Sequence, residues 1–175
     1  MVFTELSAGD ARGIAAMSAM ATSIVRECFD PLIGRAQNDH MLAMFQTERA
    51  IREQIEGGLR YFFVRDGGGR DLGFLAIRPK GDVLYLSKFY LYKAERGRGH
   101  ARRMMDFVIA QAREARCGGV ELNVNRNNEA CRVYAHLGFR IARAEKKDIG
   151  GGFFMDDYVY RLDLTPGETE EGGAS

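Results

Sequence analysis

The sequence has few of the residues that build disulfide frameworks or metal centres. Its 175 residues include three cysteines and three histidines. The number of cysteines is odd, and neither residue type shows the spacing of a metal site, so we expect reduced thiols and no metal. Reduced thiols are typical of a cytoplasmic protein. The sequence therefore favours a cytoplasmic location and argues against a disulfide-stabilised scaffold.

The chain also lacks an excess of either charge and any long apolar run. Its formal net charge is +1, so nothing draws the whole molecule to nucleic acid or to a membrane surface. No stretch of about eighteen consecutive apolar residues is present to span a bilayer. The N-terminus lacks the basic region and the apolar run of a signal peptide. We therefore expect no nucleic-acid partner and no membrane partner, and only local anion sites.

What is present is the composition of an ordinary globular protein, with 46% hydrophobic and 28% charged residues. The length suits one domain with a substantial core, and no internal repeat suggests a second domain. Residues 1–164 are expected to form this domain. Residues 165–175 offer nothing to bury and are expected to be a disordered acidic tail.

Hydrophobic periodicity and turn residues predict the elements of the first half. The first helix is expected to stop at Asp30-Pro31, followed by a loop over 31–38, because proline interrupts helices. A turn is expected at Pro79. The predicted helices cover 11–28, 39–45 and 47–55, and the predicted strands cover 3–6, 59–65, 72–78 and 83–92. The last three of these strands should form an antiparallel meander.

The second half is predicted to alternate helices and strands. Because the helix over 99–116 joins two strands with a short exit, the strands over 83–92 and 120–124 should be parallel neighbours. A second helix is expected from Asn127 or Asn128 to Leu137. The remaining predicted strands cover 139–145 and 153–164, with a loop over 149–152 and an interruption of the last strand near 155–157.

One turn carries a functional signal. Residues 96–101 (RGRGHA) lie between an apolar strand and an amphipathic helix. Backbone N–H groups and the positive end of a helix dipole point at one spot there, and Arg96, Arg98 and Arg102 lie close by. The turn therefore predicts an anion site. Taken alone, it is equally well a tight connection with solvated arginines, and it matches neither a Walker loop nor a Rossmann fingerprint.

A second motif follows after one helix and one strand. Residues 127–139 (NNEACRVYAHLGF) fit Asn-x-x-Ala-x-x-x-Tyr-x-x-x-Gly-Phe, and residues 96–101 fit Arg-x-x-Gly-x-Ala. In this order and at this distance, the two motifs resemble the GNAT superfamily of acetyl-coenzyme A-dependent N-acetyltransferases, over roughly residues 59–163. The resemblance implies a single-domain α/β (α+β) fold. Its sheet would be mixed, mostly antiparallel and twisted, with a central splayed parallel pair and helices on both faces.

The resemblance also implies where the cofactor binds. In that family the strand before the loop is splayed from its parallel neighbour, and its free backbone groups pair with the pantetheine arm. The loop N–H groups hold the pyrophosphate. Acetyl-coenzyme A would be the acetyl donor, and no metal is implied. Carried over, the cofactor-binding residues are Phe89, Tyr90, Leu91, Arg96, Gly97, Arg98, Gly99, His100, Ala101 and Asn127.

For the chemistry, the resemblance places Tyr134 near the thioester sulfur as the general acid to the coenzyme A thiolate. A neutral amine would attack directly in a ternary complex, with the Leu91 N–H meeting the oxyanion. Holding amine and thioester together would supply most of the acceleration. From its helical spacing alone, Tyr134 is by default a core tyrosine. His40, His136 and Cys131 are interpreted as structural, surface or packing residues.

One position departs from the family pattern. Lys88 stands where many relatives carry a glutamate that relays the amine proton, and a charged lysine cannot do this. The general base is therefore open between water and an acid from 31–48 or 153–158. Asp156 and Asp157 are candidates for binding a cationic acceptor, although adjacent residues in a strand face opposite ways.

The acceptor is expected under the N-terminal helices and the last hairpin, around residues 28–48 and 148–158. A small amine-bearing metabolite is favoured over a polyamine or a peptide N-terminus. Two other functions stay open: a catalytically silent acyl-coenzyme A-binding sensor or regulatory module, and an anion-binding structural domain. Whether the chain forms a homodimer is also open.

Overall fold

The computed structural model describes residues 1–165, so the tail expected over 165–175 lies outside the described residues except for Thr165. A seven-stranded sheet runs through the molecule in the order β1-β2-β3-β4-β5-β7-β6. Among the described strands, only β4 and β5 are parallel neighbours, and every other neighbouring pair is antiparallel. The strands are β1 (Val2–Glu5), β2 (Arg60–Arg65), β3 (Asp71–Lys80), β4 (Val83–Leu91), β5 (Gly119–Asn125), β6 (Arg140–Gly150) and β7 (Phe153–Asp163).

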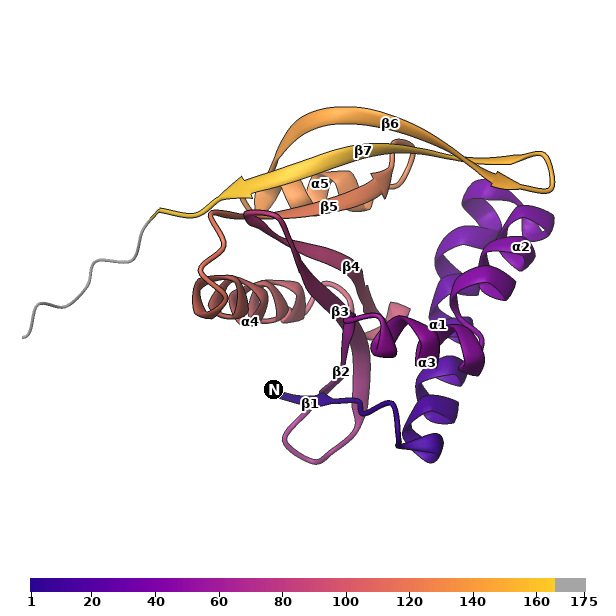
Figure 1. Cartoon of the computed structure of the whole chain (residues 1–175), viewed down its shortest axis with the longest axis horizontal. Helices are drawn as coiled ribbons and strands as arrows, with labels where there is room; N and C mark the ends of the chain where they lie inside the picture. Colours follow the sequence, from indigo (N-terminus) through magenta and orange to yellow (C-terminus); the bar gives the residue numbers. More distant parts are fainter. Residues whose placement is uncertain (166–175) are drawn as a thin grey trace, which may run out of the picture.

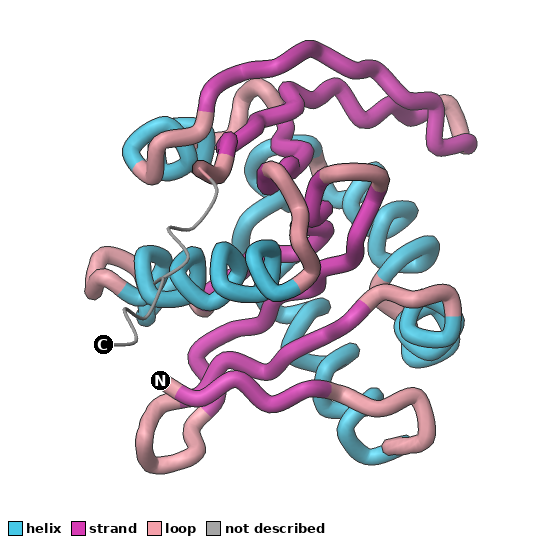
Figure 2. Tube along the Cα trace, turned by 60° about the vertical axis from the view of Figure 1, so that its left-hand side comes forward, coloured by secondary structure: helices cyan, strands magenta, loops and turns pink. Residues whose placement is uncertain are grey.

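Within residues 1–165, five α-helices cover both faces of the sheet (Figures 1 and 2). The first three lie on one face, and α4 lies on the other. They are α1 (Ala11–Ile33), α2 (Arg35–Phe45), α3 (Glu48–Glu56), α4 (His100–Glu114) and α5 (Ala130–His136), with a short 3-10 helix, η1 (Lys93–Glu95), before α4. This architecture confirms the expected α/β fold. Among residues 1–165, no helix is both long and apolar enough to cross a membrane.

Two apolar cores hold these layers together. On one face, Ile14 and Met17 of α1 are buried with Tyr61 and Phe74 of the sheet. On the other face, Met104 and Val108 of α4 are buried against the neighbouring strands. Each of these two helices packs against the sheet because its apolar residues recur at helical spacing along one face. The sheet is thus buried on both faces along its middle strands.

The parallel pair diverges, as the fold class predicts. β4 pairs with β5 only over residues 83–85, and from there β4 continues along β3 alone. The register between β3 and β4 slips by one residue, which leaves Ser87 without a partner in β3. Such a bulge bends the strand that carries it. The bend carries the C-terminal half of β4 away from β5 and opens a gap in the sheet.

The helix expected to stop before Pro31 continues to Ile33, so that prediction is wrong. Proline at this place removes one hydrogen bond from the last turn of α1. Leu32 and Ile33 compensate, because both pack against an apolar cluster with Phe29 and Leu42. The loop expected over 31–38 is also wrong, since α2 already begins after Gly34.

Strand predictions were wrong at three places. Pro79 lies inside β3 and not in a turn. Because β2 pairs with β3 only up to Ile77, Pro79 lies beyond the part of β3 that pairs with β2, and its lack of an N–H breaks no hydrogen bond to that strand. β6 extends through Ile149 to Gly150, where a loop was expected. β7 is not interrupted near 155–157, because it lies between β5 and β6 and is paired there.

The helix expected from Asn127 or Asn128 is shorter at its start than predicted. α5 begins at Ala130, whose N–H donates to Asn128 Oδ1 at 2.9 Å. The Asn127 N–H donates in turn to Asn125 Oδ1 at 2.9 Å. Side chains of asparagine compete with the helix for backbone groups in this way. Residues 125–129 therefore form a turn above the end of β5.

Candidate active site

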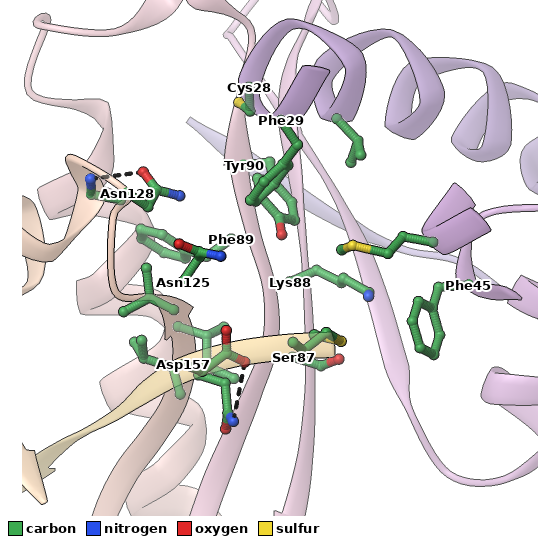
Figure 3. Close-up of a pocket in the computed structure, with 18 of the residues that line it drawn as sticks. Cys28, Phe29, Phe45, Ser87, Lys88, Phe89, Tyr90, Asn125, Asn128 and Asp157 are labelled. Atoms are coloured by element: carbon green, nitrogen blue, oxygen red, sulfur yellow. Dashed lines mark hydrogen bonds between the residues drawn. The ribbon is translucent and has the colours of Figure 1, made fainter. Parts of the chain in front are cut away.

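A cleft of about 1470 Å³ opens where β4 and β5 diverge (Figure 3). One wall comes from β4, β5 and α5, and the other from α1–α3 and the β6–β7 hairpin. Only some of the residues predicted to bind the cofactor line this cleft. Those that line it, together with the predicted catalytic residue, are Phe89, Tyr90, Leu91, Arg96, Asn127 and Tyr134. Residues 97–101 continue from Arg96 into the start of α4, outside that lining.

The free edge of β4 supplies backbone groups to the cleft. The Tyr92 N–H donates to Leu72 O at 3.0 Å, so residue 92 belongs to a hydrogen-bonded pair with β3. Such pairs alternate along an antiparallel ladder. The N–H groups of Leu91 and Phe89 consequently point away from β3, into the gap that β5 has left. An extended ligand could pair with them as a strand would.

The loop after β4 presents a second set of backbone donors. Gly97 and Gly99 have φ of +72° and +80°, which only glycine adopts without strain, and Gly99 is the N-cap of α4. Among residues 1–165, the N–H groups of residues 97–101 donate to no acceptor. Free N–H groups at a helix N-terminus attract anions. The geometry therefore fits the anion site predicted from the sequence.

Arg96 has a different surrounding from the one suggested by its sequence position. Its N–H donates to Lys93 O at 3.3 Å. Its guanidinium donates to Leu91 O at 3.2 Å and to Cys28 Sγ at 2.8 Å. Arg96 thus ties the loop to the end of β4 and to α1, although it is exposed, as are Arg98 and Arg102.

A buried carboxylate under the loop was missed by sequence analysis. Glu95 is 4% exposed and accepts a hydrogen bond from Arg70 of the β2–β3 turn. This bond lowers the pKa of Glu95, which keeps the carboxylate charged. Its second oxygen lies 3.6 Å from Nε2 of His100. The contacts support the base of the loop, and no short motif signals a pairing with a residue as distant in sequence as Arg70.

Tyr134 of α5 combines a core position with access to the cleft. It is 8% exposed, and its ring packs against Phe89 at 6.0 Å and against Phe139 at 5.8 Å. The hydroxyl makes no hydrogen bond within residues 1–165, although a buried phenol usually has a partner. Burial raises the pKa of Tyr134, so the phenol holds its proton at neutral pH. A protonated hydroxyl is available at this wall.

Lys88 projects from β4 toward the opposite wall. Its Nζ lies 5.2 Å from the centre of the Phe45 ring in α2, whereas the next residue, Phe89, contacts α5. Burial lowers the pKa of Lys88 to about 8, and no carboxylate among the described residues offsets this effect. Lys88 therefore stays mostly protonated at neutral pH, as expected for a lysine, but it loses its proton more readily than an exposed lysine does. Near pH 8 both protonation states of Lys88 are populated.

The two acids of β7 face opposite ways, as expected for neighbours in a strand. Asp156 Oδ1 pairs with Arg126 Nη2 at 2.9 Å. Asp157 is 5% exposed, lines the cleft and accepts from Asn123 Nδ2 at 3.5 Å. Burial raises the pKa of Asp157, and the nearby Asp156 charge adds to the effect. Of the two, only Asp157 is placed to act in the cleft.

The β6–β7 hairpin rests on α2 (Figure 1). Gln37 Nε2 donates to Phe154 O at 2.7 Å, and His40 Nε2 lies 2.6 Å from Ile149 O. His40 therefore has a structural place, as expected, and the expected surface position of His136 is also found. Asp39 pairs with Arg26 at 2.7 Å and does not join the site.

The fold and the splayed strand define the class of protein. The family model described as acetyltransferase (GNAT) domain matches residues 30–154. The chain therefore belongs to the GNAT acetyltransferase family and is an acyltransferase. No curated protein matches the chain in sequence.

Solved structures of similar fold carry related names. PaiA N-acetyltransferase from Thermoplasma acidophilum, in complex with coenzyme A, has a TM-score of 0.70 at 10% identity, over 94% of this chain and 100% of the other. A GCN5-related N-acetyltransferase from Rhodopseudomonas palustris has a TM-score of 0.75 at 15% identity, over 93% and 95%. A chimera of Vibrio cholerae spermidine N-acetyltransferase SpeG and hSSAT has 0.65 at 14%, over 93% and 96%. At these identities the likeness shows the fold.

Proposed function

We propose that the chain transfers an acetyl group from acetyl-coenzyme A to a primary amine of a small molecule. The observation that supports this most is the arrangement of donors along one path. Free N–H groups start at residues 97–101, continue along the free edge of β4, and end at Phe89, whose ring packs against that of Tyr134. A diphosphate, an extended amide-bearing arm and a thiolate would meet matching groups in that order.

In this proposal each segment of the path binds one part of the cofactor. The N–H groups of residues 97–101 hold the pyrophosphate, because Gly97 and Gly99 let it approach the backbone. The backbone of residues 89–91 pairs with the pantetheine arm. Asn127, exposed at the rim of the cleft, donates to the same arm. The Arg96 side chain holds the loop in place through Leu91 and Cys28.

Bound acetyl-coenzyme A supplies a thioester, and the chain supplies positions and protons. The Leu91 N–H, which points into the gap, stabilises the negative charge that develops on the carbonyl oxygen. Tyr134 donates its proton to the departing sulfur. Burial raises the pKa of Tyr134, so the phenol is protonated when the thiolate leaves. Attack takes place directly, with amine and thioester held together in one ternary complex.

Asp157 is the residue we propose as the general base. It is the buried carboxylate of the cleft, and burial raises its pKa toward the range in which a base is useful. Its bond to Asn123 fixes its orientation. The base that the sequence left open is thereby assigned within the candidate range 153–158. We further propose a cytoplasmic setting, in line with the three free cysteines.

The test is an amine panel with two measurements. Purified protein is incubated with acetyl-coenzyme A and each amine; thiol release and the acetylated product are followed. We expect thiol release that depends on an amine, together with a rise in melting temperature on adding acetyl-coenzyme A alone. A rise without any turnover would identify a silent acyl-coenzyme A-binding module instead. Absence of both effects would overturn cofactor binding altogether.

A further inference from the structure

Lys88 is a cation without a counter-ion in the acceptor part of the cleft. Burial is the sole cause of its pKa shift, and among residues 1–165 no carboxylate pairs with it. We propose that Lys88 is the anion-binding residue of the acceptor site, so that the acceptor is a small amine that also carries a carboxylate or a similar anionic group. This inference rests on the proposed function and narrows its substrate class.

The position of Lys88 suits this role. It follows the bulge at Ser87 and points away from the cofactor face, since Phe89 contacts Tyr134 while Lys88 reaches Phe45 (Figure 3). Its surroundings are largely apolar. The neighbouring lining residues from the helices include Phe29, Met41, Leu42, Met44 and Phe45. A partly buried ammonium in such surroundings is costly unless an anion joins it.

The same pocket holds the complementary charge. Asp157, from β7, is buried and lines the pocket that Lys88 enters (Figure 3). Glu145, which also lines it, is already paired with Arg143 at 2.9 Å. An acceptor with one amine and one anionic group would place the amine at Asp157 and the anion at Lys88. Charge-assisted bonds of this kind are about twice as strong as neutral ones.

The arrangement argues against a polyamine. A polycation that reached Asp157 would bring further ammonium groups toward Lys88, where like charges repel. The lining carboxylate Glu53 already pairs with Arg49 at 2.8 Å, and the apolar side chains around Lys88 offer such groups no partner. They suit instead the hydrocarbon body of an amino-acid-like molecule. The substrate class that follows is a small zwitterion with an apolar or weakly polar side chain.

Matched pairs of acceptors test this inference. Each pair contains an amino acid and the amine that lacks only its carboxylate, for example phenylalanine with 2-phenylethylamine and methionine with 3-(methylthio)propylamine. We expect kcat/KM for the amino acid to exceed that of its partner by about tenfold or more. Lys88→Met keeps an unbranched side chain that is one atom shorter and removes the charge. It should lower kcat/KM for the amino acid by about 10- to 100-fold and for the partner far less.

Controls separate this effect from misfolding and from general charge. Lys146 also lies over a phenylalanine ring, that of Phe154 at 4.8 Å, but its side chain is exposed. Lys146→Met should leave both members of each pair unchanged. Lys88→Arg should keep part of the preference. The melting-temperature rise with acetyl-coenzyme A should survive in Lys88→Met, which shows that the cofactor site is intact.

The possible failures point to different conclusions. If wild type prefers the carboxylate-free amines, or if Lys88→Met lowers both members of each pair equally, this inference is overturned and the acetyltransferase function stands. If no amine of any kind is acetylated, the proposed function is overturned, and the substrate class falls with it.

Discussion

The two halves of the cleft are built from different chemical groups. In the cofactor half, formed by β4, the loop 96–101, α4 and α5, most of the donors belong to the backbone. In the acceptor half, formed by α1–α3, the β6–β7 hairpin and the face of β4 that carries Lys88, the polar groups are side chains such as Lys88 and Asp157. A backbone site needs little more than the correct turn and small residues. A side-chain site instead depends on which residues happen to meet, and it can change its ligand without changing the fold.

The largest expected effect lies where the two halves meet. Tyr134→Phe keeps the ring that packs against Phe89 and removes the free hydroxyl. Loss of a general acid should lower kcat by about 100-fold or more, while KM for acetyl-coenzyme A changes by less than about threefold. Steady-state kinetics with varied cofactor would check this. A variant with unchanged kcat would remove Tyr134 from the chemistry.

Asp157→Asn tests the acceptor half alone. A general base must be ionised, so wild-type activity should fall as the pH drops through the raised pKa of Asp157. The variant should lose about 100-fold in kcat/KM and should lack this acidic limb. The pH profile of kcat/KM gives the measurement. Asp156→Asn is the matched control, because Asp156 pairs with Arg126 outside the cleft, and its activity should stay near that of wild type.

Lys88→Met should stabilise the protein, because it removes a buried charge from the acceptor half. The folded-state pKa of about 8 lies below the ordinary value of 10.5, so the unfolded chain binds more protons between these two values. Stability of the wild type should therefore rise with pH across this window. At pH 7 the variant should gain about 1–3 kcal/mol in free energy of unfolding. Denaturant melts at pH 7 and pH 10 would show this gain shrinking as the pH rises. A difference in stability between variant and wild type that is the same at both pH values would contradict a buried ammonium.

A smaller effect is expected from strain in the cofactor half. Gly99→Ala puts a side chain at φ +80°, which costs about 1–2 kcal/mol and should raise KM for acetyl-coenzyme A by about tenfold. Gly58→Ala has a similar constraint, at φ +103°, beyond the end of α3 and with no atom within 4 Å of the added carbon. Both variants should lose stability, and only the first should lose cofactor affinity. Equal KM in the two would place the cofactor elsewhere.

The cofactor half could be predicted from the sequence because its signals are local. The glycines of residues 96–101, the apolar strand before them and the amphipathic helix after them are contiguous in the chain. Even there, the direction of the Arg96 side chain depends on Cys28, and the support of the loop depends on Arg70. These are contacts between distant segments, which no local pattern encodes.

The acceptor half was predicted less well for a physical reason. The end of α1 is set by packing of Leu32 and Ile33 in a cluster that only the folded chain creates. The continuity of β7 at Asp156 and Asp157 comes from pairing on both of its edges. Alternation along a strand predicted that these two acids separate, but not which of them enters the cleft. Likewise, the surroundings that perturb Lys88 come from Phe45, which is far away in sequence.

The way the β6–β7 hairpin sits on α2 restricts which residues its tip can carry. Both hydrogen bonds end on main-chain carbonyls, those of Phe154 and Ile149, so they fix the path of the backbone. On that path the three glycines at positions 150–152 have φ of +82°, +62° and +80°, where a side chain is strained. Changes in sequence along this hairpin are therefore easier to accommodate in its strands than at its tip.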